Sequence, residues 1–408
     1  MRWLKRGALA LFALVFVALA GVGAVFWAVG TESGTVWLIG RLVAAAPQIS
    51  IERVRGSLLG GVRLENVSMR TPRDELDIDS LTLEWNAPAL LTGVLAFRHA
   101  DATRAAYRRV PDVPSGGGGP PKLPWPLRID EGSVSELSIT IQDTTLTFTS
   151  NTLAGTYYDA HLELTDVAGT FGDTALAADA TIDLADDIEI TLTSQWSGPL
   201  AGVAASGSFT LSGTWPELTV NHELITPFAA TTTGTLVAGP FSVDVVNTWQ
   251  NLAWPSVAGV ASPSGRLALA GSLDDYRYEG TGTVDVLDRD ASFTVAGTGQ
   301  RLLLALEQLE LVPAAPGRGS LTAGGNVDLE GRDTSLDLAA RGFDPAWIVA
   351  AWPGRLDGTA QLRAGLEPEP NVTLAGLALG GELRGYPVTL GGAATLTDSD
   401  RVRLDMLR

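Results

Sequence analysis

The feature that most constrains this sequence is an alternation of apolar and polar residues that returns many times along its 408 positions. Runs such as Leu137–Ile141 (LSITI) and Ile188–Leu192 (IEITL) make every second side chain apolar. A period of two puts these side chains on one face of a β-strand, with Ser, Thr, Asp or Glu on the other. The chain is therefore predicted to be mainly β, with one apolar and one polar sheet face.

Turn residues and weak internal repeats indicate how the strands are joined. Glycine, asparagine and aspartate interrupt the alternation at short intervals, as expected for antiparallel strands joined by tight turns. The stretch Phe209–Leu218 recurs loosely at Leu267–Tyr276 and again at Gly324–Asp333. Repeats of this kind predict an elongated antiparallel sheet whose strands each contact only their neighbours. Helical patterns are confined to Thr35–Ala46 and Pro345–Trp352.

The N-terminus predicts where the protein resides. Residues Gly7–Val29 carry no charge, and a helix of this length spans about 30 Å, enough to cross a bilayer. Basic residues before the run and Glu32 after it predict a single-pass anchor with a cytoplasmic N-terminus and the bulk of the chain in the periplasm. The predicted flanking residues of this anchor are Arg2, Trp3, Lys5, Arg6 and Trp27.

A cleaved signal peptide is the alternative interpretation of the same segment. Ala18-Leu19-Ala20 has the small-x-small form that signal peptidases accept. The apolar run nevertheless continues through Val22 to Val29, which favours an uncleaved anchor. Either outcome exports the same domain.

Composition divides the chain further and excludes some functions. Residues 111–126 combine prolines with an unbroken glycine run, which predicts a loop between an N-terminal cap at 31–110 and the repetitive sheet at 127–408, with the anchor at 1–30. With 46 acidic against 28 basic residues, the net charge of −18 repels phosphate backbones and argues against nucleic-acid binding. The absence of cysteine excludes disulfides, thiolate metal sites and cysteine nucleophiles.

No constellation of residues predicts catalysis, a metal or a cofactor. His99, His161 and His222 are far apart in sequence, and the zinc-protease-like start at His222-Glu223 has Thr226 where a second histidine would be needed. The acidic pairs Asp186-Asp187 and Asp274-Asp275 are interpreted as turn residues rather than calcium ligands or glycosidase carboxylates. The protein is predicted not to be an enzyme.

Five motifs, in this order, resemble the TamB family, the AsmA-like inner-membrane component of the translocation and assembly module. They are Arg55–Gly61 followed by Leu64–Val67, then Leu81–Gly93, Trp249–Pro255, Ser262–Tyr276 and Trp352–Gly358. The resemblance extends from the anchor to about residue 365. Members of the family are usually longer, so we expect this sequence to be an N-terminal portion of such a protein.

The resemblance implies a β-taco, a long curled sheet that forms an open groove with an apolar lining. It also implies a role in outer-membrane biogenesis: phospholipid transport, protein translocation and assembly, or both, with an outer-membrane barrel partner of the TamA/BamA type contacted through a C-terminal region not present here. Phospholipid acyl chains are the expected occupants of the groove. Its predicted lining consists of Leu137, Ile139, Ile141, Leu146, Phe148, Leu162, Leu164, Ile182, Leu184, Ile188, Ile190 and Leu192.

Two other functions are compatible with a repetitive exported sheet. A passive adhesin or surface scaffold would need an outer-membrane or cell-wall anchor instead of an N-terminal inner-membrane helix, so cell fractionation distinguishes it. A glycan-active enzyme would need paired carboxylates on facing walls, and none can be assigned from the sequence.

Overall fold

The computed structural model of the chain describes residues 27, 30–71, 74–109, 126–141, 144–184, 187–238, 241–253, 260–286, 288–331, 333–365, 371–397 and 401–405. The predicted anchor at Gly7–Val29 lies outside these residues except for Trp27, and so does the predicted loop at 111–126 except for Pro126. Within the described part of the chain, no helix is both long enough and apolar enough to cross a membrane. The anchor and its flanking residues therefore stay a prediction.

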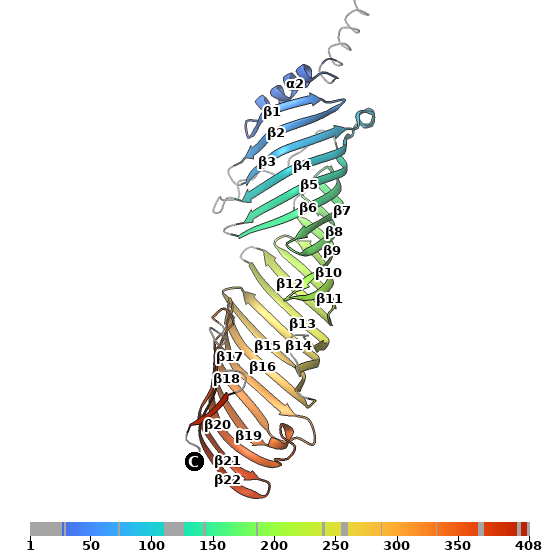
Figure 1. Cartoon of the computed structure of the whole chain (residues 1–408). Coiled ribbons are helices and arrows are strands. Elements are labelled where there is room, and N and C mark those ends of the chain that lie inside the picture. Colours follow the sequence, from blue (N-terminus) through green and yellow to red (C-terminus); the bar gives the residue numbers. More distant parts are fainter. Residues whose placement is uncertain are drawn as a thin grey trace, which may run out of the picture. The chain divides into compact units, whose positions relative to one another are not determined.

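The chain forms two compact units that meet between Gly198 and Pro199. The first unit contains one helix and an array of strands: α2 (Glu32–Ala45), β1 (Ile49–Ser57), β2 (Gly61–Arg70), β3 (Asp74–Trp85), η1 (Ala87–Thr92), β4 (Leu95–Arg109), β5 (Leu127–Ile141), β6 (Thr144–Tyr158), β7 (His161–Phe171), β8 (Thr174–Asp183) and β9 (Glu189–Leu200), which reaches the boundary. Figure 1 shows these strands stacked in chain order, with α2 beside β1. The unit boundary lies inside the segment 127–408, which the sequence analysis treated as one array.

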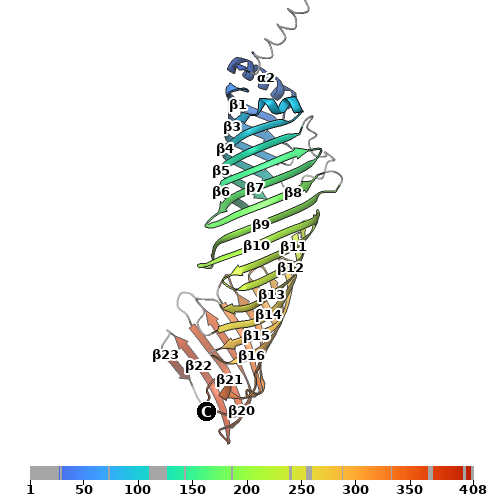
Figure 2. The same ribbon diagram turned by 90° about the vertical axis from the view of Figure 1, so that its right-hand side faces the viewer.

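The second unit repeats the same plan. Each strand from β10 to β22 pairs antiparallel with the next along the chain. Its elements are β10 (Val203–Thr214), β11 (Glu217–Thr226), β12 (Ala229–Ala238), β13 (Phe241–Ala253), β14 (Val260–Ser272), β15 (Asp275–Val286), β16 (Asp290–Gln300), β17 (Leu303–Pro313), β18 (Ser320–Asp328), β19 (Asp333–Phe343), η2 (Pro345–Trp347), β20 (Gly354–Gly365), β21 (Asn371–Leu383), β22 (Tyr386–Thr397) and β23 (Arg401–Asp405). Figure 2 shows this unit from the side, with the strands in chain order.

One strand pair departs from the predicted antiparallel array. Strands β4 and β5 run parallel, with Leu95 opposite Leu127 and Arg109 opposite Ile141. Parallel neighbours cannot be joined by a tight turn, because the chain must return to the edge from which the first strand began. The Pro/Gly-rich stretch at 111–126 thus joins two neighbouring strands of the same sheet.

Helix α2 confirms the helical pattern predicted at Thr35–Ala46, and local residues explain its ends. Thr31 has an extended backbone, and its hydroxyl accepts a hydrogen bond from Gly34 N at 3.1 Å, so it caps the helix N-terminus. The helix ends at Ala45, just before Pro47. The fully buried Thr35 accepts a hydrogen bond from Leu58 N at 3.2 Å, which ties α2 to the β1–β2 hairpin.

In the second unit, aromatic rings lie directly against glycines of the neighbouring strand. The cross-strand pairs are Trp249 with Gly265, Tyr276 with Gly299, Tyr278 with Gly297 and Phe293 with Gly282. A methyl group added to Gly265 would lie 2.1 Å from the Trp249 ring, so glycine is required for that close approach. The rings cover backbone that glycine leaves bare, and they stabilise strands with few other large side chains.

Candidate functional site: an apolar sheet face without a covering layer

The strand register places most of the predicted groove lining on one face of the first unit. Leu137 of β5 lies opposite Phe148 of β6, and Ile139 lies opposite Leu146. Residues directly opposite each other across a pair of strands point to the same side of the sheet. The same face continues across β4, where Ala105 lies beside Leu137.

Strands β7 to β9 continue this apolar face. Ile182 of β8 lies between Leu162 of β7 and Ile190 of β9. In the adjacent row, Ala180 lies between Leu164 and Leu192. Nine of the twelve predicted residues therefore share one face: Leu137, Ile139, Leu146, Phe148, Leu162, Leu164, Ile182, Ile190 and Leu192.

The other three predicted residues have different positions. Leu184 and Ile188 lie between β8 and β9, outside the paired strands, because β8 ends at Asp183 and β9 begins at Glu189. Ile141 is the last residue of β5, and its side chain lies outside the described part of the structure. The strict alternation predicted for Ile188–Leu192 thus holds only from Glu189 onward.

Two β-bulges keep the apolar face continuous where the simple alternation fails. Ser150 in β6 and Asp166 in β7 have φ values of 53° and 52°, and the strand register shifts beside Ser150 in the β6–β7 pair and beside Asp166 in the β7–β8 pair. An extra residue in one strand reverses which alternate positions face the same side. As a result Val167 and Phe171 join Leu162 and Leu164 on one face despite their odd numbers.

This face is not buried beneath another layer. None of the nine residues is buried, and Leu146 is 38% exposed. The helices among the described residues are short: α2 and η2 pack against the sheets, and η1 contacts β4. Antiparallel sheets normally pack their apolar side against a core, so an open apolar face of this extent marks a surface that meets something apolar.

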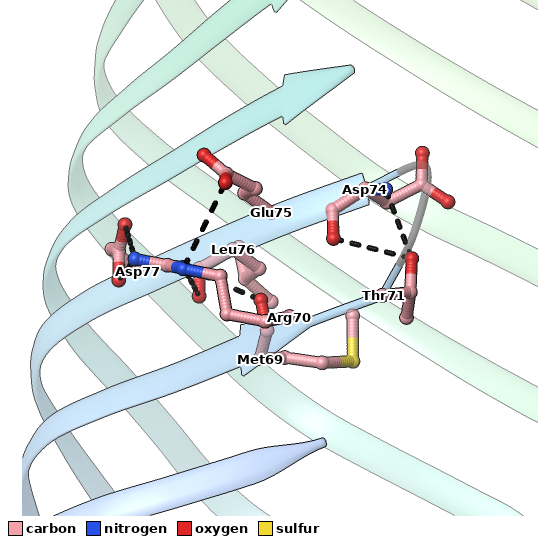
Figure 3. Close-up of polar contacts among 7 residues, drawn as sticks. All are labelled: Met69, Arg70, Thr71, Asp74, Glu75, Leu76 and Asp77. Atoms are coloured by element: carbon pink, nitrogen blue, oxygen red, sulfur yellow. Dashed lines mark hydrogen bonds and ion pairs between the residues drawn. The ribbon is translucent and has the colours of Figure 1, made fainter. Parts of the chain in front are cut away.

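The opposite face of the first unit is polar, and several of its charges form ion pairs. Arg70 Nη2 donates to both Asp77 carboxylate oxygens at 2.8 Å, and Nη1 donates to the carbonyls of Met69 and Leu76 at 3.3 and 3.4 Å (Figure 3). The bond to Asp77 is the main cause that raises the pKa of the Arg70 guanidinium, against a lesser effect of desolvation. The Thr71 hydroxyl and Asp74 backbone close the turn beside it. These contacts stabilise the β2–β3 hairpin.

The second unit contains a partly open apolar cavity. A cavity of about 610 Å³ lies among β18 to β22 and the segment that follows β19. Its lining contains no charged side chain. The residues that contribute most of its wall include Leu338, Phe343, Leu356, Leu374, Leu377, Leu379, Leu383 and Leu390 from the sheet and Pro345, Ile348 and Trp352 from the segment.

This segment, residues 344–353, is fixed at both ends and is called the roof segment here. Asp344 accepts hydrogen bonds from Ala346 N and Gly354 N, each at 3.0 Å. Trp347 is buried, contacts Phe343 edge-on at 6.2 Å between ring centroids, and donates from Nε1 to the carbonyl of Asp290 at 3.1 Å. The helix predicted at Pro345–Trp352 is therefore shorter than expected, with turn-type hydrogen bonds continuing to Trp352.

Polar residues interrupt the apolar face of the second unit in one row. His222 of β11, Thr232 of β12 and Asn247 of β13 lie opposite one another, and Thr232 Oγ1 donates to Asn247 Oδ1 at 2.7 Å. Partial burial lowers the pKa of His222 below its ordinary value of 6.5, so its neutral form is favoured. The row is a hydrogen-bonded element within the sheet.

The remaining histidines lie apart from this row. His99 is on the polar face of the first unit, with Nδ1 3.1 Å from Glu131, and His161 contacts the ring of Tyr158. No group of three or more His, Asp or Glu side chains in the described residues could hold a metal ion. The structure brings no two of the three histidines together.

Sequence reasoning missed the roofed cavity. The lining was predicted only between residues 137 and 192, whereas the cavity is lined between Leu321 and Leu390. Two signals were available: the closely spaced Leu374, Leu377 and Leu379, and an apolar helical pattern at Pro345–Trp352 within a chain of strands. The sheet curvature that brings the roof segment over β18 to β22 could not be predicted from the sequence.

Comparison with known proteins identifies one family. The family model described as "TamB, N-terminal domain" matches residues 21–106 and 119–408, which is most of the chain. No curated protein and no solved structure gives a match.

Proposed function

The chain belongs to the TamB family, and from this membership and the uncovered apolar face we propose that it is a non-enzymatic envelope-biogenesis protein, anchored in the inner membrane, that carries phospholipid acyl chains along its sheet. The acyl chains would contact the apolar face while the headgroup stays toward water. An outer-membrane barrel partner of the TamA/BamA type would receive or direct the cargo.

The single observation that carries the proposal is the alignment of nine apolar residues on one sheet face, where eight are only half-buried and Leu146 is exposed. Each methylene group moved from water onto an apolar surface contributes about 0.8 kcal/mol. A face such as that formed by Leu162, Ile182 and Ile190 therefore offers a favourable, non-directional environment to a hydrocarbon chain. Because this attraction has no fixed geometry, a chain can move along the sheet without breaking specific bonds.

The roofed cavity of the second unit supports the same proposal. Its volume of about 610 Å³ and its lining without charged residues suit a hydrocarbon and exclude an ionic substrate. A polar or charged ligand would lose its hydration there without gaining partners.

Strand β9 offers a matched pair of positions for a test. Ile190 lies on the apolar face opposite Ile182, whereas Thr191, its neighbour, lies on the other face opposite Thr181. Photo-crosslinking amino acids at 190 and 191, in the full chain in cells, should capture phospholipid only at 190. Ile190→Asp should reduce lipid transport, and Thr191→Asp should leave it unchanged.

Two outcomes would reject the proposal. Equal capture at both positions would mean that lipid does not distinguish the faces. Absence of capture at 190, while the folded full-length protein is present, would mean that this face meets something other than lipid.

A further inference from the structure

Helix α2 carries apolar residues on both of its sides and has few charges for a surface helix. Its 14 residues, ESGTVWLIGRLVAA, contain only two charges, Glu32 and Arg41. A helix that packs one side on a sheet usually turns charged side chains to water on the other. The composition of α2 therefore indicates that both sides of the helix contact an apolar environment.

The structure accounts for only one of these sides. Gly34 and Thr35 are buried and Leu38 and Ile39 are half-buried, on the side tied to the β1–β2 hairpin. The exposed side consists of Glu32, Ser33, Val36, Trp37, Gly40, Arg41 and Ala44. Their spacing of three and four residues forms one continuous stripe along the helix. Val36 and Trp37 are 44% and 51% exposed, so much of the apolar centre of the stripe is left open to its surroundings.

An aromatic and cationic arrangement occupies the start of this stripe. Trp37 packs against Trp27 with 6.3 Å between ring centroids, and the Arg41 guanidinium lies 5.7 Å from the Trp37 ring. Tryptophan rings with a neighbouring arginine are typical of the water–lipid interface, where the ring is half apolar and the guanidinium meets phosphate. Trp27 also belongs to the uncharged run Gly7–Val29, which ends two residues before the Thr31 cap.

The local charge agrees with an anionic surface. Between residues 31 and 65 there are four arginines and three glutamates, a small positive excess, although the whole chain has a net charge of −18. Arg55 and Arg63 lie directly opposite each other in β1 and β2, and both are more than half exposed beside the single carboxylate of Glu65. Like charges that face each other across strands are unfavourable unless an anion lies nearby.

We propose that α2 lies in the interface of the membrane in which the predicted anchor is embedded, with its Val36–Trp37 stripe among the upper acyl chains and Arg41 at anionic phosphates. The occupant is the lipid surface itself, because the anchor would end only two residues before Thr31 and holds the helix within reach of it. The proposal rests on the predicted anchor and not on lipid transport along the sheet. Interfacial helices combine an apolar stripe with cationic residues in the same way.

The cysteine-free sequence makes a site-specific test simple, because any introduced cysteine is the only one. The full chain would be placed in nanodiscs of phosphatidylcholine with 30% phosphatidylglycerol, with a fluorophore on Val36→Cys. The matched control is Leu329→Cys, an exposed apolar residue at a turn of the second unit. Nitroxide on the upper acyl chain should quench the label at 36 several-fold more than the label at 329, and aqueous iodide should show the reverse.

The charge contribution is tested separately. In nanodiscs of phosphatidylcholine alone, or with Arg41→Gln in the mixed nanodiscs, lipid quenching at position 36 should fall and iodide quenching should rise. Equal quenching at 36 and 329, or failure of the chain to associate with nanodiscs, would overturn the proposal. High iodide accessibility at 36 in the mixed nanodiscs would also overturn it. Photo-crosslinking at position 190 tests lipid binding along the sheet, and none of these outcomes decides its result.

Discussion

Asp344 fixes both ends of the roof segment, and its removal should open that segment locally. In Asp344→Ala, the hydrogen bonds from Ala346 N and Gly354 N, each 3.0 Å long, are lost. Loss of a capping carboxylate costs about 1 kcal/mol, and a hydrogen bond to a charged acceptor contributes about 1.5–3 kcal/mol. Because Asp344 is only half-buried and water can replace part of both bonds, we expect a local loss of about 2 kcal/mol.

Hydrogen–deuterium exchange measures this opening directly. A loss of about 2 kcal/mol corresponds to about 30-fold faster exchange of the amides of residues 346–354 if they exchange by local opening. The control is Asp337→Ala, which removes a hydrogen bond from the exposed Gln361 side chain on the neighbouring strands and should change exchange little. A change of less than threefold in the roof segment, or equally faster exchange from β10 to β23, would refute the idea of a separately held roof.

Three further predictions follow from the sequence and the described contacts. The N-terminal segment should remain uncleaved, so N-terminal sequencing of native protein should not yield Gly21 as the first residue. Alanine at His99, His161 or His222 should leave cellular function intact, and loss of function in any of these folded variants would reopen an enzymatic interpretation. The lowered pKa of His222 means that the folded state binds this proton less readily than the unfolded chain, so its contribution to stability is lost as pH falls below 6.5 and is constant above it. Urea midpoints measured at pH 7.5 and 5.5 should therefore differ less in His222→Leu than in the natural sequence, and an equal difference would contradict this assignment.

The strands were predictable because period-two alternation is a local property of the sequence. The pattern over Leu81–Trp85 lies within β3, and that over Leu146–Phe148 lies within β6. The β-bulges were harder to predict from the sequence. In β7 the adjacent polar residues Thr165 and Asp166 mark the bulge, but strict alternation would have turned Val167 away from the face that it joins.

Features that depend on distant residues could not be predicted. The parallel pairing of β4 with β5 depends on where the chain rejoins the sheet at Leu127 after a long connection. No local sequence pattern specifies that position. The cavity likewise requires Trp347 to reach Asp290, 57 residues earlier in the chain. Sequence patterns identified the apolar residues, whereas sheet curvature decides which of them enclose a space.

In the second unit, each aromatic ring that packs on a glycine limits how both residues can change during evolution. At Trp249 and Gly265, a larger residue in place of the glycine collides with the ring, and a smaller residue in place of the ring uncovers the backbone. A single change at either position is thus harmful, and a compensating change must come from the opposite strand. Among relatives, Trp249 and Gly265, or Tyr278 and Gly297, should be replaced together, and such covariation would report strand register where overall identity is low.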